Sequence, residues 1–343
     1  MLCKAQNPDN RLLTDKQAVC FNAGNKISGL LPMPRIDDSS TTTVAFLYST
    51  HDAAEKHEKE GGSAFIVGKP FDLDISGKLM RFYVPFMVSN LHVAFQGCPY
   101  IRLNKRDGSP HIIDRECTDW VTHPEGDDVA VTCVFNEINK DEHDITHVAV
   151  NDFITPEKIE GYDLGIGEDV FMVGRFINLQ GRDQIRPVTR FGNISLMIEP
   201  LPNKAINKDQ ESFAVEMRSR TGFSGSPVMV YRTAGTNLAR PKTNVENFHA
   251  LLGINWGFVY DENGENTWLN GVVPAWKIIE TLDTPELQEK YDDAVEYATP
   301  RILEELSGGG VEPSVANQDD NSSHKEDFIR LLGEAVSSPP TDD

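Results

Sequence analysis

The clearest chemical signal in the chain is a serine placed between glycines. Ser224 lies in the segment 220–228, Arg-Thr-Gly-Phe-Ser-Gly-Ser-Pro-Val, between two runs rich in β-branched residues. Flanking glycines let the backbone turn sharply, so that a hydroxyl projects while main-chain N–H groups face one point. A nucleophile beside an oxyanion hole needs this arrangement. An ordinary tight turn uses the same residue types, so the segment alone leaves both interpretations open.

A serine nucleophile requires a base, and the base requires a carboxylate that fixes its tautomer. His92 is a candidate base, since it follows the long apolar run 81–89. Asp127 and Asp128 compete as the carboxylate, because both come just before the apolar run 129–131. Seen alone, the histidine could be a strand-end core residue and either aspartate a turn residue or strand cap. The triad interpretation fails only if all three residues have these ordinary structural roles.

Together the three segments resemble the boxes of the trypsin-like, chymotrypsin-fold serine proteases. Ser89-Asn90-Leu91-His92 resembles the histidine box, Asp128-Val129-Ala130-Val131 the aspartate strand, and residues 222–227 the serine box, in the family's order. Residues 62–67 are similar to the strand before the histidine box, and residues 253–257, Gly-Ile-Asn-Trp-Gly, to the strand that walls the substrate pocket. The serine box and this last strand look closest to the bacterial glutamyl endopeptidase branch.

The resemblance extends over about residues 41–282 and implies a serine endopeptidase that acts on a protein or peptide through an acyl-enzyme. Ser224 would be the nucleophile and His92 the general base and later the general acid. Asp128 would be the orienting carboxylate, because the family's aspartate directly precedes its strand. The resemblance implies neither a metal ion nor an organic cofactor. The oxyanion hole would be formed by the N–H groups of Gly222 and Ser224, and the substrate pocket by Ser219, Asn255, Trp256 and Gly257.

Three positions depart from the family's pattern. Phe223 stands where the digestive enzymes have an aspartate that pairs with a freed N-terminal amine, so activation by that route is not expected. Val93 replaces the cysteine that follows the histidine. Asn255 replaces the histidine found before Trp-Gly in glutamyl endopeptidases, so a preference for cleavage after glutamate is not inherited. Phe223 and Asn255 also motivate an alternative function, a catalytically latent or inactive protease-fold protein that binds or scaffolds.

Three further signals are weaker. Arg218 and Arg220 precede the serine and could meet an acidic substrate side chain, although exposed structural arginines are the more ordinary explanation. His143 and His147 have the i, i+4 spacing of a zinc-protease helix, but their β-branched neighbours show no helical pattern, which argues against a metal site. A lipase-type nucleophile elbow is disfavoured because Ser226 stands where its second glycine belongs.

The elements that must position these residues are β-strands. Asn263-Gly264, between two strand-like runs, predicts a hairpin. The pattern predicts an all-β fold of two six-stranded-type antiparallel, chymotrypsin-like β-barrels. The first barrel, over 41–150, would supply His92 and Asp128, and the second, over 151–283, Ser224 and the pocket. The ten β-branched and aromatic runs are residues 43–48, 63–67, 81–89, 129–135, 169–173, 188–195, 213–217, 227–231, 250–256 and 268–273.

The two ends of the chain differ from this β pattern. Residues 1–40 show no sustained period, which predicts an N-terminal arm. Helical spacing and a Thr-Pro-Glu start predict C-terminal helices over 274–282 and 284–306. Residues 307–343 predict a flexible acidic tail that holds a short amphipathic helix over 325–336. Such a helix is marginal alone, so we expect it to bind this chain or a protein partner.

Charge and composition narrow the partners and the compartment. The 343 residues carry a net charge of −21, of which −12 falls from Asp283 onward. That charge disfavours nucleic acid and anionic membranes as partners. The five cysteines are widely spaced without a C-x-x-C pair, which is typical of free thiols in a reducing compartment. No run of 18 apolar residues and no secretory signal are visible, so we expect a cytoplasmic protein.

Overall fold

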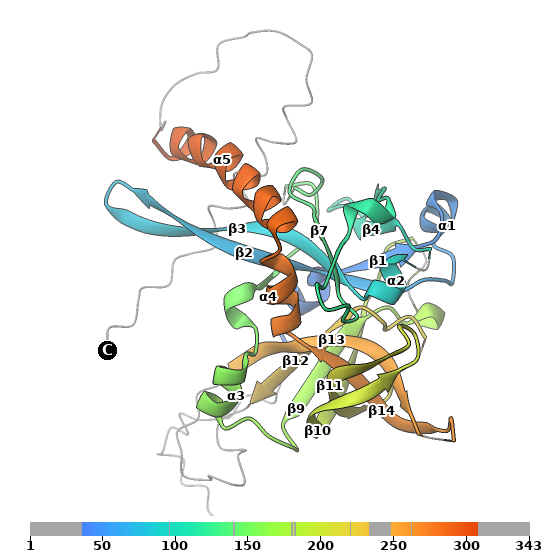
Figure 1. Ribbon diagram of the computed structural model, residues 1–343. Helices are drawn as coiled ribbons and strands as arrows, with labels where there is room; N and C mark the ends of the chain where they lie inside the picture. Colours follow the sequence, from blue (N-terminus) through green and yellow to red (C-terminus); the bar gives the residue numbers. More distant parts are fainter. Residues whose placement is uncertain are drawn as a thin grey trace, which may run out of the picture. The chain divides into compact units, whose positions relative to one another are not determined.

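Two antiparallel β structures and a pair of C-terminal helices make up the described part of the chain (Figure 1). The computed structural model describes residues 36–95, 97–139, 141–179, 181, 183–219, 221–232, 248–261 and 263–307. Residues 1–35 of the expected arm, and the tail with its expected helix over 325–336, lie outside the described residues. The prediction of a mostly β, chymotrypsin-like fold with C-terminal helices is confirmed. One detail differs: the first β structure is an eight-stranded sheet, and only the second is a closed six-stranded barrel.

The first β structure is an eight-stranded sheet in the order β5-β4-β1-β2-β3-β7-β6, with β8 paired to β2. Its pairs are antiparallel apart from the parallel β2–β8 contact. β2 and β3 continue beyond the sheet as a long hairpin, paired from Phe65–Val88 to Ile75–Lys78. The strands are β1 (Val44–Tyr48), β2 (Ser63–Ile75), β3 (Lys78–Ser89), β4 (Tyr100–Asn104), β5 (Pro110–Ile113), β6 (Val121–Thr122), β7 (Ala130–Cys133) and β8 (Val148–Ala149).

The second β structure is a closed six-stranded barrel in the order β10-β11-β14-β13-β12-β9. It lies below the first sheet in Figure 1. The expected hairpin at Asn263-Gly264 connects β13 to β14, and Gly264 has a φ of +80°. The strands are β9 (Asp169–Gly174), β10 (Val188–Asn203), β11 (Lys208–Met217), β12 (Ser226–Arg232), β13 (Phe248–Tyr260) and β14 (Asn266–Pro274).

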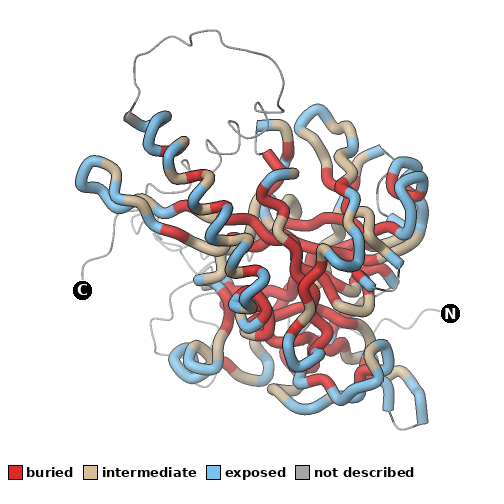
Figure 2. Tube along the Cα trace, turned by 45° about the horizontal axis from the view of Figure 1, so that its top comes forward, coloured by how far each residue is buried: buried red, intermediate tan, exposed pale blue. Residues whose placement is uncertain are grey.

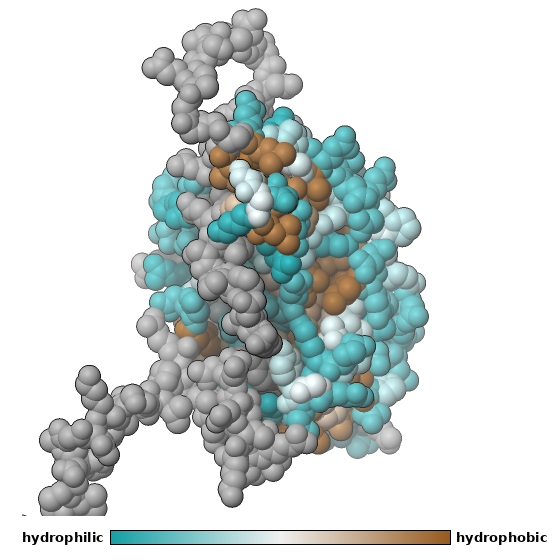
Figure 3. Space-filling model, turned by 90° about the vertical axis from the view of Figure 1, so that its left-hand side faces the viewer, coloured by the Kyte–Doolittle hydropathy of each residue, from teal (hydrophilic) through white to brown (hydrophobic). Residues whose placement is uncertain are grey.

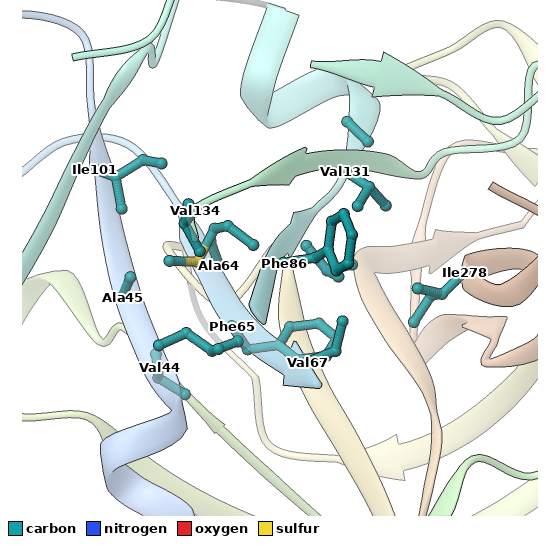
Figure 4. Close-up of a cluster of buried hydrophobic side chains, with 14 of the residues drawn as sticks. Val44, Ala45, Ala64, Phe65, Val67, Phe86, Ile101, Val131, Val134 and Ile278 are labelled. Atoms are coloured by element: carbon teal, nitrogen blue, oxygen red, sulfur yellow. The ribbon is translucent and has the colours of Figure 1, made fainter. Parts of the chain in front are cut away.

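Each of the ten sequence runs overlaps a strand, and the buried core follows from these strands. β1 is buried along its whole length, which explains its unbroken apolar sequence Val-Ala-Phe-Leu-Tyr. Figure 2 shows buried residues concentrated where the first sheet meets the barrel. Ile278 of the C-terminal helix α4 belongs to the same cluster as Phe65, Phe86 and Val131 (Figure 4). The helix is therefore part of the core and not an appendage.

Two C-terminal helices close the described chain: α4 (Trp276–Leu282) and α5 (Pro285–Ser307). α5 contains Pro300 and continues through that proline to Ser307, as the predicted range 284–306 requires. α5 packs on the first sheet, where the Tyr291 hydroxyl donates to the carbonyl of Pro70 (2.7 Å). Figure 3 shows apolar side chains gathered on one face of the molecule. Leu79 of the β2–β3 hairpin and Leu303 and Leu306 of α5 are exposed large apolar residues.

Short helices lie in connections for which the sequence shows no helical pattern. The polar interval 136–161 holds β8, a 3-10 turn and the start of a helix. These short helices are α1 (His51–Lys56), α2 (Leu91–Phe95) and α3 (Pro156–Tyr162), with 3-10 turns η1 (Asp38–Thr43), η2 (Cys117–Asp119), η3 (Val150–Asp152) and η4 (Ile177–Leu179).

Arg175, which directly follows β9 of the barrel, is fully buried against the first sheet. Its guanidinium lies 4.1 Å from the ring centre of Tyr48 and donates to the carbonyls of Leu47 (3.0 Å) and Glu58. Burial lowers the pKa of Arg175 to about 10. Burial also raises the pKa of Tyr48 to about 12, although the nearby charge of Arg175 opposes that rise. The two β structures thus share a buried, carbonyl-bound cation.

Candidate active site

His92 and Asp128 meet because the strands next to them pair. α2, which carries His92, directly follows β3, and Asp128 comes two residues before β7. Antiparallel pairing of Ser89 with Ala130 brings these two ends together. Nδ1 of His92 lies 2.7 Å from Oδ2 of Asp128, and the main-chain N–H of His92 donates to Oδ1 at 3.0 Å. Since Nδ1 donates to the carboxylate, Nε2 is left as the basic nitrogen.

The barrel holds Asp128 from the other side, through two amide side chains that no motif indicated. Asn203 donates from Nδ2 to Oδ2 of Asp128 (3.1 Å), and Gln210 accepts the main-chain N–H of Asp128 (2.9 Å). Both amides are buried and lie on the paired strands β10 and β11. Asn203 sits in a Pro-Asn-Lys turn sequence, so it looks like an ordinary turn residue. Asp128 is itself fully buried, and four residues bind it: these two, His92, and Asn90, which donates to its carbonyl.

Asp127, the competing carboxylate, faces a different cluster. Its oxygens lie 2.7 Å from Nζ of Lys208, 3.3 Å from Nζ of Lys277 and 3.3 Å from Nδ1 of His123. Burial alone would raise the pKa of Asp127, but the Lys208 hydrogen bond and the Lys277 and His123 charges outweigh it and lower the pKa. Asp127 is therefore an ion-pair residue next to the site, and Asp128 is the aspartate in contact with His92.

The Ser224 loop is shaped by two glycines and anchored by a serine of the first sheet. Gly222 and Gly225 have φ values of +103° and +84°, and a Cβ on Gly225 would lie 2.0 Å from the carbonyl oxygen of Ser63. The Ser63 main-chain N–H donates to the carbonyl of Ser224 (2.8 Å). Its hydroxyl donates to the carbonyl of Gly222 (2.9 Å) and accepts the N–H of Arg175 (2.9 Å). Ser63, which no sequence signal marked as functional, thus fixes the loop to both β structures.

The Ser224 hydroxyl is bound to main chain in this conformation. Within the described residues, it donates to the carbonyl of Trp256 (3.3 Å), and no hydrogen bond joins it to His92. The N–H groups of Gly222 and Ser224 have no acceptor among those residues. Unoccupied amides are what an oxyanion hole requires. Ser224 and His92 line the same cleft, so a rotation of the serine side chain is the movement that attack would need.

The cleft has a volume of about 360 Å³ and contains three of the four expected pocket residues. Ser219, Asn255 and Gly257 line it, whereas the Trp256 ring packs over Gly271 and donates from Nε1 to Ser212 (3.0 Å). Trp256 is not among the residues that line the cleft, although its carbonyl accepts the Ser224 hydroxyl. The full lining is Gly61, Gly62, His92, Val93, Cys98, Ser219, Thr221, Gly222, Ser224, Asn255, Gly257 and Phe258.

Two of the departures from the family's pattern are structural supports. Phe223 is fully buried and stacks on Phe176, with ring centres 6.4 Å apart. Asn255 is also buried and donates from Nδ2 to the carbonyl of Phe223 (2.9 Å). The Asn255 side chain therefore stabilises the loop that carries Ser224. Its Oδ1 has no hydrogen-bond partner among the described residues.

The weaker sequence signals fall outside the cleft. Arg218 is exposed and does not line the cleft, and Arg220 lies outside the described residues. His143 lies 2.5 Å from His111, and His147 packs on Tyr83. Within the described ranges, no three His, Cys, Asp or Glu side chains are grouped as a metal ion would require.

Comparisons with known proteins identify structures of similar fold. No protein-family model and no curated protein matches the chain. The protease domain of MamO from Magnetospirillum magneticum, in its apo form, is 17% identical, with a TM-score of 0.45 over 71% of this chain and 96% of that one. Deg5 is 16% identical, with a TM-score of 0.38 over 70% of this chain and 87% of that one.

An inactive mutant form of Rv3671c from M. tuberculosis H37Rv is 12% identical, with a TM-score of 0.34 over 74% of this chain and 95% of that one. None of the three structures is described as a glutamyl endopeptidase, so that branch stays a prediction. Similarities of this size say nothing about activity, which has to come from the geometry of the chain's own residues.

Proposed function

We propose that the chain is a serine endopeptidase in which Ser224, His92 and Asp128 hydrolyse peptide bonds through an acyl-enzyme. The observation that carries the proposal is the 2.7 Å contact between His92 and a fully buried Asp128, in the cleft that also contains Ser224. A buried carboxylate hydrogen-bonded to Nδ1 orients an imidazole and stabilises its protonated form. Few purely structural arrangements would leave such an imidazole in a cleft beside a serine.

The reaction follows from these positions. The Ser224 hydroxyl leaves the Trp256 carbonyl and donates its proton to Nε2 of His92 as Oγ attacks the substrate carbonyl carbon. The resulting oxyanion accepts hydrogen bonds from the N–H groups of Gly222 and Ser224, each worth about 3 to 4 kcal/mol in such enzymes. Protonated His92 then gives its proton to the departing amine. Water, deprotonated by His92, hydrolyses the acyl-enzyme and restores Ser224.

Active-site labelling tests the proposal directly. A fluorophosphonate probe should label the wild type at Ser224, and Ser224→Ala should abolish both the label and turnover of casein or a peptide library. Ser226→Ala is the matched control, because Ser226 is two residues away and fully buried. A label that persists in Ser224→Ala would place the nucleophile elsewhere.

The alternative, a latent protease-fold binding protein, has one observation in its favour. The Ser224 hydroxyl is bound to Trp256 instead of His92, which is a resting arrangement. If the wild type neither takes the probe nor cleaves any peptide, while still binding peptides, the chain is a binding protein. Probe labelling of the wild type excludes this alternative.

We also propose a cytoplasmic location and a protein or peptide as the substrate. In the described residues, no helix combines the length and apolarity needed to cross a membrane. Cys98, Cys117 and Cys133 are free thiols, as a reducing compartment favours. Cell fractionation with an antibody against the chain would test the location.

A further inference from the structure

The hairpin formed by β13 and β14 displays an aromatic side chain in an unusual way. Trp268 is 75% exposed, the highest exposure among the large apolar residues that the structure describes. Its φ is +65°, in the left-handed region that bulky side chains avoid. Glycine or asparagine would adopt this conformation with less strain. The backbone conformation and the exposure are therefore both unfavourable for a tryptophan that only had to fold.

A β-bulge produces this display. Phe258 pairs with Asn270 and Tyr260 with Asn266, so three residues of β14 lie opposite the single residue Val259. Two side-chain hydrogen bonds hold the bulge. The Trp268 N–H donates to Oδ1 of Asn266 (2.7 Å), and the hydroxyl of Thr267, which lies between them, donates to the carbonyl of Val259 (2.7 Å). Bulges beside active sites commonly re-aim a side chain. Here the bulge carries Trp268 out of the strand ladder.

The hairpin is continuous with the candidate active site along two routes. Phe258 of β13 lines the cleft that contains Ser224. On the other side, Nζ of Lys204 lies 5.1 Å from the ring centre of Tyr260, and the preceding residue, Asn203, binds Asp128. The exposed aromatic residues of this hairpin therefore belong to the surroundings of the triad.

We propose that Trp268, with Tyr260, forms an accessory subsite that binds an apolar or aromatic side chain of an extended peptide. This inference rests on the proposed peptidase function. Tyr260 comes four residues after Trp256, whose carbonyl binds Ser224, so the two are about 13 Å apart along the strand. An extended substrate advances by the same rise for each residue, so the side chain bound at the subsite lies about four residues from the scissile bond. The substrate class is a peptide with an aromatic or large aliphatic residue at that distance.

The subsite can be tested with three substitutions at one position. Trp268→Ala removes the ring, Trp268→Phe keeps an aromatic side chain, and Trp268→Asn keeps the tolerance for a left-handed backbone without the ring. Leu79→Ala is the control, because Leu79 is an equally prominent exposed residue on the β2–β3 hairpin. The substrates are an eight-residue peptide with an aromatic residue four positions from the cleaved bond, the same peptide with alanine there, and a tripeptide ester.

The expected result is a loss of about tenfold in kcat/KM for the aromatic peptide in Trp268→Ala and Trp268→Asn, most of it in KM. Trp268→Phe should retain most of the activity, and Leu79→Ala all of it. The alanine peptide and the ester should not distinguish the variants. An equal loss on the ester, or no loss on the aromatic peptide, would overturn the subsite.

A binding measurement separates this inference from the peptidase function. Calorimetric titration of the full chain with the aromatic peptide measures binding and does not require turnover. If the wild type binds the peptide without cleaving it and Trp268→Ala does not bind, the subsite stands and only the proposed activity falls. If neither binds, or both bind equally, the subsite is wrong whatever the activity.

Discussion

Asn203, from the barrel, donates a hydrogen bond across 3.1 Å to the carboxylate of Asp128, which is held by the first sheet. The same carboxylate oxygen accepts from His92. An aspartate that orients an imidazole is thus itself oriented by the other half of the molecule. Asn203 does not line the cleft that contains Ser224, so it is a positioning residue within the proposed mechanism.

Asn203→Ala should lower kcat by about tenfold and leave KM unchanged, because the orienting bond is lost while the substrate cleft is intact. Kinetics on a peptide substrate, together with the low-field proton NMR signal of His92 Nδ1–H, would measure this. Asn193→Ala is the matched control, since Asn193 is an exposed asparagine of the same strand. A rise in KM at constant kcat would contradict a positioning role.

Ser63→Ala should destabilise the fold and disturb the serine loop together. The change leaves the N–H of Arg175 and the carbonyl of Gly222 without their buried partner, which costs about 2 kcal/mol of unfolding free energy. The free energy of unfolding measured in denaturant and the rate of fluorophosphonate labelling should both fall. Ser109→Ala, at an exposed turn, should change neither. Normal labelling in a destabilised Ser63→Ala protein would show that the loop does not depend on this bond.

Asp127→Asn should remove a pH-dependent part of the stability. Because ion pairs lower the pKa of folded Asp127 below its ordinary value of 3.8, the carboxylate stabilises the fold above that pH. The contribution is lost as the pH falls through 3.8 to the folded pKa. The thermal midpoint of Asp127→Asn should therefore lie below that of the wild type at pH 7, and the gap should narrow below pH 3.8. Asp293→Asn, on the exposed face of α5, is the control. A gap that is constant with pH would refute the ion-pair explanation.

Truncation after Leu306 should leave the thermal midpoint unchanged, because the buried residues of α5, among them Ala298 and Ile302, precede the cut. We expect it to change peptidase activity or partner binding, since it removes the segment predicted to carry an amphipathic helix. Truncation after Asp283 removes α5 as well and should lower the midpoint. Identical midpoint, peptidase rate and pull-down profile after the shorter truncation would show that the tail has no such role.

The sequence predicts most of the strands and the candidate residues Ser224, His92 and Asp128, because both depend on local patterns. Alternating apolar runs mark strands wherever one face is buried, and glycines beside Ser224 mark a sharp turn. The Asn203 and Ser63 contacts could not be predicted in this way. Each joins groups more than 70 residues apart through one hydrogen bond, and neither asparagine in a turn nor serine at a strand start is unusual. Trp256 shows the same limit, since a strand residue's main chain can face the cleft while its ring faces the core.

Pro300 lies inside the helix that the sequence predicts over 284–306. Proline in a helix interior removes one hydrogen bond and normally ends or bends the helix. α5 continues past it to Ser307, and Ala298 and Ile302 on either side are buried. Tertiary packing of the helix face therefore outweighs the local preference.

The buried Arg175 has a consequence for how this protein is made. The carbonyl of Leu47, which it binds, is 128 residues earlier in the chain. At about 5 to 20 residues per second, a ribosome needs on the order of ten seconds to synthesise the intervening segment. During that time the newly made first sheet lacks the cation that binds its carbonyls and exposes apolar strands that are buried in the finished protein. We therefore expect gene fragments divided between the two β structures to be insoluble when they are expressed separately, because each exposes apolar strands that the other covers.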